Sequence, residues 1–224
     1  SQSPPDRDLT METLVGVLDG ELIVHNHCYR ADEMAYMIDV AQEFGYRIGT
    51  FHHAVESYKL ADYLAEKDIC SAMWADWWGS KLELFDGVQQ NVALVAQAGA
   101  CAVVHSDSAR GIQRLNQEAA KAATAGRRMG MEISDGEAMR WITLNAAKSL
   151  GVEDETGSIE VGKAADLVLW HGHPLSVYAK AQQVYIDGYL YYDRADPSRQ
   201  PRSDFSIGTA PVPSPDQPRP GGGE

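Results

Sequence analysis

The sequence predicts an α/β fold, and three observations support this prediction. Short apolar segments typical of strands alternate with segments that have the periodicity of amphipathic helices, over four consecutive strand–helix units. The strand segments are apolar throughout, as in a parallel sheet that is covered on both faces. Polar residues, chiefly histidines, lie where these strands end. Together these features indicate a parallel α/β sheet or barrel.

The strand–helix units follow one another from residue 21 to residue 130. We expect strands at 21–27, 46–53, 69–75 and 100–107, and helices at 31–44, 57–68, 88–99 and 111–130. Gly45 follows the last apolar position of the first helix and is its expected C-terminal stop. An aromatic loop at 76–87 separates the third strand from its helix.

The pattern changes after residue 134. One helix is expected at 134–150, with Ser134 and Glu137 as a capping box and Gly151 as its C-cap. Two short strand runs follow within 157–170, and 183–192 reads as a hairpin around Asp187-Gly188. From residue 196 onward, Pro, Ser, Asp and Gly dominate, so we expect a disordered tail.

Composition narrows the classes of function. The chain has 224 residues, a net charge of −13 and a sequence pI of about 4.9. Such a polyanion gains nothing from nucleic acid or anionic lipid, so neither is an expected partner. No segment approaches the roughly 20 apolar residues of a membrane span. The cysteines at 28, 70 and 101 are odd in number and lie in apolar runs, which favours buried free thiols over disulfides.

Three polar residues follow strands of the predicted sheet. His27 follows the first strand, His53 the second and Asp107 the fourth. Active sites of parallel α/β barrels form at these strand ends. Two imidazoles and a carboxylate suit zinc or a similar divalent ion, which would lower the pKa of a water molecule toward roughly 7. A carboxylate beside that water could transfer its proton to a leaving amine.

Each of these residues also has a structural interpretation. A histidine at a strand end can simply bond a backbone carbonyl, and Asp107 in "SDSARG" could cap the next helix. His25 and His105 lie two residues before His27 and Asp107, so we expect them beside the ligands or the substrate. Strand parity does not decide between His52 and His53. The aromatic residues Trp74, Trp77 and Trp78 could line a substrate pocket, while His171 and His173 fit a surface turn.

The order of several segments resembles the metal-dependent amidohydrolase superfamily, in its imidazolonepropionase-like and prolidase-like branch. These segments are "VHNHCYRADEM", "FHHAVESYKLADYLAE", "VVHSDS" and, most specifically, "LNAAKSLGVEDETGSIEVGKAADLVLW". The resemblance covers roughly residues 20 to 193 and implies a partial (β/α)8 TIM-type barrel, formed by its last four βα units, followed by part of a small β-sandwich. It divides the chain into a C-terminal barrel half at 1–152, a sandwich segment at 153–195 and the tail at 196–224.

The resemblance also implies an activity and a site. It implies a metal-dependent hydrolase of non-peptide C–N bonds, in amides or cyclic amides of a small-molecule substrate, with zinc as the expected metal and one or two ions in the complete enzyme. His27 matches the ligand after the fifth barrel strand, and His53 rather than His52 matches the ligand after the sixth. Asp107 matches the aspartate that both binds metal and transfers protons. His25, His105 and Trp74 remain candidates for contacts behind the ligands or on the substrate side.

The sequence departs from the superfamily at its start. The His-x-His pair of the first barrel strand and the bridging Lys or Glu of the fourth have no counterpart, and only a short polar lead precedes residue 20. We therefore expect the chain to be the C-terminal portion of a longer enzyme, which pairs with the missing half or forms a homo-oligomer. The alternative is a non-catalytic relative that acts as a subunit or binding scaffold. Substrate and compartment stay open.

Overall fold

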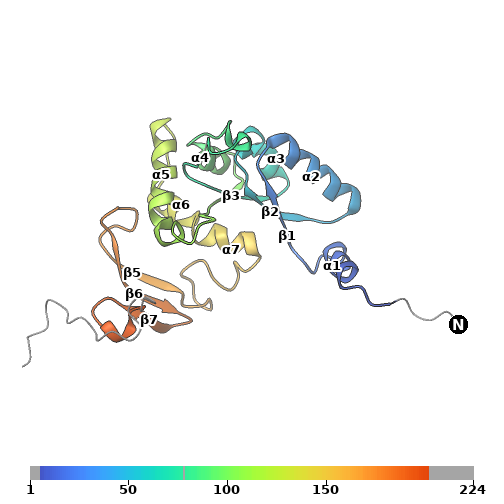
Figure 1. Cartoon of the computed structure of the whole chain (residues 1–224). Coiled ribbons are helices and arrows are strands. Elements are labelled where there is room, and N and C mark those ends of the chain that lie inside the picture. The colour runs from blue at the N-terminus through green and yellow to red at the C-terminus, as the bar shows by residue number, and fades with distance from the viewer. Residues whose placement is uncertain (1–5, 78, 202–224) are drawn as a thin grey trace, which may run out of the picture.

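A computed structural model describes residues 6–77 and 79–201 of the chain. Its first sheet is parallel and four-stranded, in the order β1-β2-β3-β4, which is also the order in the chain (Figure 1). The strands are β1 (Val24–Cys28), β2 (Ile48–His53), β3 (Cys70–Met73) and β4 (Cys101–Val104). The predicted α/β class is correct, and the four strands form where the apolar runs indicate them.

Helices follow each strand of this sheet. α2 (Ala31–Phe44), α3 (Ala61–Glu66) and α4 (Asn91–Gln97) connect consecutive strands, and α5 (Leu115–Arg128) follows β4; short 3-10 turns lie at Ser57–Lys59, Leu82–Leu84 and Ile112–Arg114. Gly45 ends α2 in the left-handed conformation, as expected. Met34 of α2, Phe51 of β2 and Val92 of α4 are fully buried in the core between helices and sheet.

A second packing layer covers the opposite face of the sheet. There Cys70, Ala72, Cys101 and Val103 form a smaller buried cluster, and Ala146 packs against them. Ala146 belongs to α7 (Leu144–Leu150), which Figure 1 shows on the side of the sheet away from α2–α4. The sheet is thus covered on both faces, which explains why its strands are apolar instead of alternating.

Two local predictions fail, and one helix forms where none was predicted. The single helix expected at 134–150 is two helices, α6 (Asp135–Arg140) and α7, because the backbone at Thr143 leaves the helical region. Ser134 still caps the first of them by accepting from the Glu137 amide, and Gly151 ends the second. The lead before residue 20 contains a helix, α1 (Leu9–Leu18), which Asp8 caps. Of the two strand runs expected within 157–170, the first forms turns and bends, and only the second is a strand.

The C-terminal part forms a separate antiparallel sheet in the order β5-β6-β7. Its strands are β5 (Leu167–His171), β6 (Lys180–Ile186) and β7 (Tyr189–Asp193), followed by a 3-10 turn at Pro197–Arg199. The predicted hairpin is present: Asp187 and Gly188 both have positive φ, at 50° and 78°. Most of the expected tail, residues 202–224, lies outside the described residues, as does Trp78.

The expectation of free thiols is wrong for two of the three cysteines. Cys70 and Cys101 form a disulfide, while Cys28 is a buried free thiol. The two bonded cysteines are direct register partners on neighbouring parallel strands, so their side chains leave the sheet on the same face. The bond joins β3 to β4 in the layer that α7 covers.

No helix in the described ranges has the length and apolar character needed to cross a membrane.

Candidate active site

The candidate site lies at the carboxyl edge of the parallel sheet, where the ends of all four strands meet. His27 and His53 are near or at the ends of β1 and β2, and His105 directly follows β4, with its amide bonded to the Met73 carbonyl of β3. Because the strands are parallel, residues far apart in the chain are brought together at this edge.

His27 and His53 meet directly. The Nδ1 atom of His27 lies 2.7 Å from Nε2 of His53, and the two rings are edge to face with centroids 4.1 Å apart. His27 is exposed, whereas His53 is only 5% exposed. The two residues that were matched to metal ligands therefore bring one ring nitrogen each into direct contact.

The backbone at the end of β2 explains how His53 reaches this position. His53 and Ala54 have positive φ angles of 69° and 42°, which residues other than glycine seldom adopt. The Ala54 amide bonds the Cys28 carbonyl, and the Asn91 side-chain amide donates to the Ala54 carbonyl. Asn91 is itself buried and also accepts from the Tyr58 amide. These bonds hold the strained turn and thereby the His53 ring.

Asn91 is a site residue that sequence reasoning missed. It supports the position of His53 through its bond to the Ala54 carbonyl. Its only signal in the sequence is an amide side chain at the start of an otherwise apolar helix, "NVALVAQ".

A second histidine pair lies on the same face of the sheet. His25 Nδ1 is 2.8 Å from His52 Nε2, and the register places His25 beside Thr50 and His27 beside His52. Both His25 and His52 are half-buried. His25 thus contacts His52, which is the direct neighbour of His53 in the chain.

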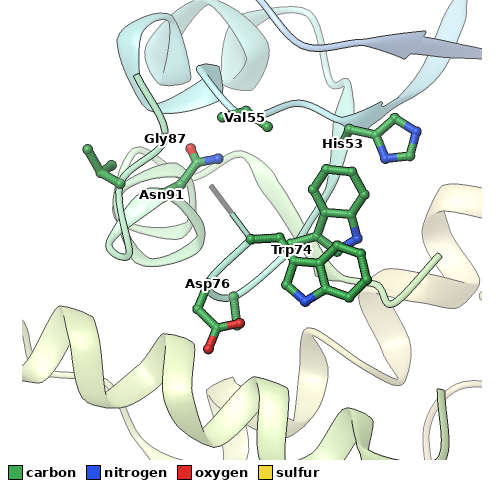
Figure 2. Close-up of a pocket in the computed structure, with 9 residues that line it drawn as sticks. His53, Val55, Trp74, Asp76, Gly87 and Asn91 are labelled. Atoms are coloured by element: carbon green, nitrogen blue, oxygen red, sulfur yellow. The ribbon is translucent and has the colours of Figure 1, made fainter. Parts of the chain in front are cut away.

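His105 and Trp74 complete the aromatic surroundings of His53. The Trp74 ring stacks on His53 at 4.5 Å and on His105 at 5.2 Å, and its Nε1 donates to the Ser106 carbonyl. Figure 2 shows the His53 imidazole next to the Trp74 indole, at the edge of a small pocket that Asp76 and Asn91 also line. Trp77 stacks on the outer side of Trp74 and is 48% exposed.

Burial keeps these imidazoles neutral. It lowers the pKa of His53 to about 4, with His27 contributing in the same direction and Asp107 opposing it. Burial and the neighbouring His53 lower the pKa of His105 to about 3. Neutral imidazole is the form that binds a metal. In the described part of the chain, His53 Nδ1 and His105 Nε2 are buried without a hydrogen-bond partner, which is unusual away from functional sites.

Asp107 lies near the histidines but makes no cap. Its negative charge opposes the lowering of the pKa values of His52 and His53, which burial causes in the first place, and its side chain is exposed. Ser108, and not Asp107, accepts from the Arg110 and Gly111 amides. The helix-cap interpretation of Asp107 therefore fails, and its φ of 46° marks a second strained position at the site.

The residues fit part of a metal site. Within residues 6–77 and 79–201, no group of three or more His, Cys, Asp or Glu side chains is arranged to hold a metal ion. The imidazole nitrogens of His27 and His53 nevertheless lie close together, and they suit two of the ligand positions of a zinc-type centre.

A parallel α/β domain with histidines at the carboxyl ends of its strands is consistent with a TIM-barrel-type domain that builds its site at that edge. A model of the amidohydrolase family matches residues 21–190. The chain therefore belongs to the amidohydrolase family.

Individual relatives agree with this assignment. The amidohydrolase tasK of Hapsidospora irregularis is 30% identical over 191 residues, 83% of this chain and 19% of that protein. An imidazolonepropionase of Shewanella baltica is 62% identical over a stretch of 38 residues, 17% of this chain and 9% of that protein. The crystal structure of an amidohydrolase from Thermotoga maritima is 34% identical with a TM-score of 0.77, over 86% of this chain and 49% of that one. The chain thus spans about half or less of these relatives.

Proposed function

We propose that this chain carries part of the active site of a metal-dependent hydrolase that cleaves C–N bonds in amides or cyclic amides. The convergence of His27 and His53 at neighbouring strand ends carries the proposal. Membership of the amidohydrolase family supports it. The pKa of about 4 at His53 supports it further, because the imidazole then offers a free lone pair at neutral pH.

Each residue has a separate role in this proposal. His27 and His53 hold a divalent metal, most simply zinc, and Asp107 is its third ligand from this chain. A divalent ion held there would supply Lewis-acid chemistry, which lowers the pKa of water toward neutrality. Asp107 accepts a proton from the attacking water and returns it to the leaving nitrogen, so that the amine leaves as a neutral group. Trp74 and His105 exclude bulk water from the inner side of His53.

Further ligands would come from strands that pair with this sheet. In the described residues, β1 and β4 are the outer strands of the parallel sheet, and each has one edge without a partner strand. We propose that additional strands close this sheet into a (β/α)8 barrel and that β5–β7 form part of a sandwich beside it. Those strands would belong to the other half of the same enzyme; assembly of two copies of this chain is the alternative.

The test measures metal content and turnover in the complete enzyme. We expect His27→Ala and His53→Ala each to weaken zinc binding by roughly 10- to 100-fold or more and to abolish amide hydrolysis. His173→Ala is the matched control, because His173 is exposed and its ring contacts Asp135 at 3.1 Å and the Leu175 amide at 3.3 Å, away from the candidate site. Full zinc occupancy in both site variants, measured by elemental analysis, would refute the ligand assignment.

A further inference from the structure

The positively charged side chain of Lys81 contacts the Tyr29 ring, which in turn contacts the pair His27 and His53. Its ammonium group donates to the Tyr29 hydroxyl at 2.5 Å and lies 4.0 Å from the centre of the Tyr29 ring. That ring in turn stacks on His53 and meets His27 edge-on, at 5.0 Å in each case.

The loop that carries Lys81 is held in place by packing. Lys81 directly precedes the 3-10 turn Leu82–Leu84, and Leu84 is buried in a cluster with Tyr29 and Val55, against which Trp74 packs. Tyr29 follows β1, so Lys81 and Tyr29 come from segments 52 residues apart. The position of the ammonium group therefore follows from a packed contact between two loops at the site.

The charge on Lys81 lacks an acidic partner in the part of the chain that the structure describes. Five other lysines each contact a carboxylate there: Lys59, Lys67, Lys121, Lys148 and Lys163. Lys81 makes no such ion pair although the chain carries a net charge of −13, and its side chain is exposed. An ammonium group has three N–H donors, of which the Tyr29 hydroxyl uses one.

We propose that Lys81, together with the Tyr29 hydroxyl, binds a carboxylate group of the substrate. The hydroxyl accepts a hydrogen bond from Lys81 and can still donate its own hydrogen, so the pair presents donors on both sides to one anion. The substrates are then amides with a free carboxylate close to the scissile C–N bond. This inference rests on the proposed function, because it places the reacting bond at His27 and His53.

Binding of two matched probes tests the inference without requiring turnover. N-acetylglycine carries a carboxylate, whereas N-acetylglycinamide has the same skeleton without the charge. We expect the wild-type enzyme to bind N-acetylglycine at least roughly 10-fold more tightly in NMR titrations, the ratio that a charge-assisted hydrogen bond typically supplies. Lys81→Met keeps the aliphatic stem and should remove this preference, and Lys81→Arg should restore most of it.

Lys148→Met is the control, because Lys148 pairs with Asp68 on the exposed surface and takes no part in the site. Equal affinity of the wild-type enzyme for both probes, no binding of N-acetylglycine near its solubility limit, or a preference that survives Lys81→Met would each overturn the inference. Zinc content is measured separately and is expected to be the same in Lys81→Met as in wild type. A failure of the metal assignment at His27 and His53 is therefore distinguishable from a failure at Lys81.

Discussion

Reduction of the Cys70–Cys101 disulfide should destabilise the parallel domain strongly. The bond closes a loop with a sequence separation of 31 residues. In the chain-entropy treatment, opening such a loop increases the entropy of the unfolded state by about 12 cal/mol/K, which lowers the free energy of unfolding by about 4 kcal/mol at 25 °C. At about 2–4 °C per kcal/mol for a chain of this size, the melting temperature should fall by roughly 8–16 °C.

Thiol counting under denaturing conditions checks the bond itself. The sequence contains three cysteines, of which only Cys28 is free in the structure. The unfolded protein should therefore show one reactive thiol before reduction and three after it. Urea unfolding of oxidised and reduced wild type then compares two states of the same sequence, so that no side-chain volume changes between them.

Two variants control the comparison. Cys28→Ala should preserve the difference between oxidised and reduced protein, because Cys28 lies outside the bond. In the double variant Cys70→Ala/Cys101→Ala, the reductant should have no effect. Three reactive thiols in the unreduced protein, or coincident urea transitions of the two wild-type samples, would show that the bond is absent or does not stabilise the fold.

Two further substitutions test the site and the packing that supports it. Asp107→Asn should lower turnover by about 100-fold or more, because asparagine cannot accept the proton. The melting temperature should hardly change, because asparagine also tolerates the positive φ. Near-normal turnover would leave Asp107 without a catalytic role. Gly126→Ala should lower the free energy of unfolding by roughly 1–2 kcal/mol, because overpacking costs about 1–3 kcal/mol and helix propensity returns up to about 1 kcal/mol. The Cβ added at Gly126 would lie 2.5 Å from Ala93 Cβ and from Ile133 Cδ1. Gly136→Ala in α6 is the control, because its added Cβ would have no neighbouring atom closer than 3.9 Å. If both variants matched wild type in chemical denaturation, this reasoning would be contradicted.

Local rules predicted the regular elements well, because each element carries its own signal. The apolar runs, Gly45, Ser134 and Asp187-Gly188 all act within a few residues of the structure that they determine. The break between α6 and α7 lacks such a signal, since "WITLNA" contains neither glycine nor proline. The two helices pack in different surroundings: Trp141, which directly follows α6, is buried in the main core, and Ala146 of α7 packs on the other face of the sheet.

The disulfide shows the limit of counting cysteines. An odd number of cysteines without a spacing motif favours free thiols when only the chain order is known. Whether Cys70 meets Cys101 depends on the register of β3 against β4, and a shift of one residue would place the two side chains on opposite faces of the sheet. The register depends on how the helices pack between the strands, which is information that the spacing of cysteines does not contain.

The choice between His52 and His53 depends on backbone geometry in the same way. Alternation along β2 places His52 on the face that also carries His25 and His27, and would turn His53 toward the helices. His53 nevertheless contacts His27, because alternation holds only while φ stays in the extended region and the φ of His53 is 69°. The bonds that maintain this turn come from distant residues: the Cys28 carbonyl, and Asn91, which is 37 residues from Ala54 along the chain. Residues at strand ends are thus the positions where a period of two is least informative, and they are also where a parallel sheet places its chemistry.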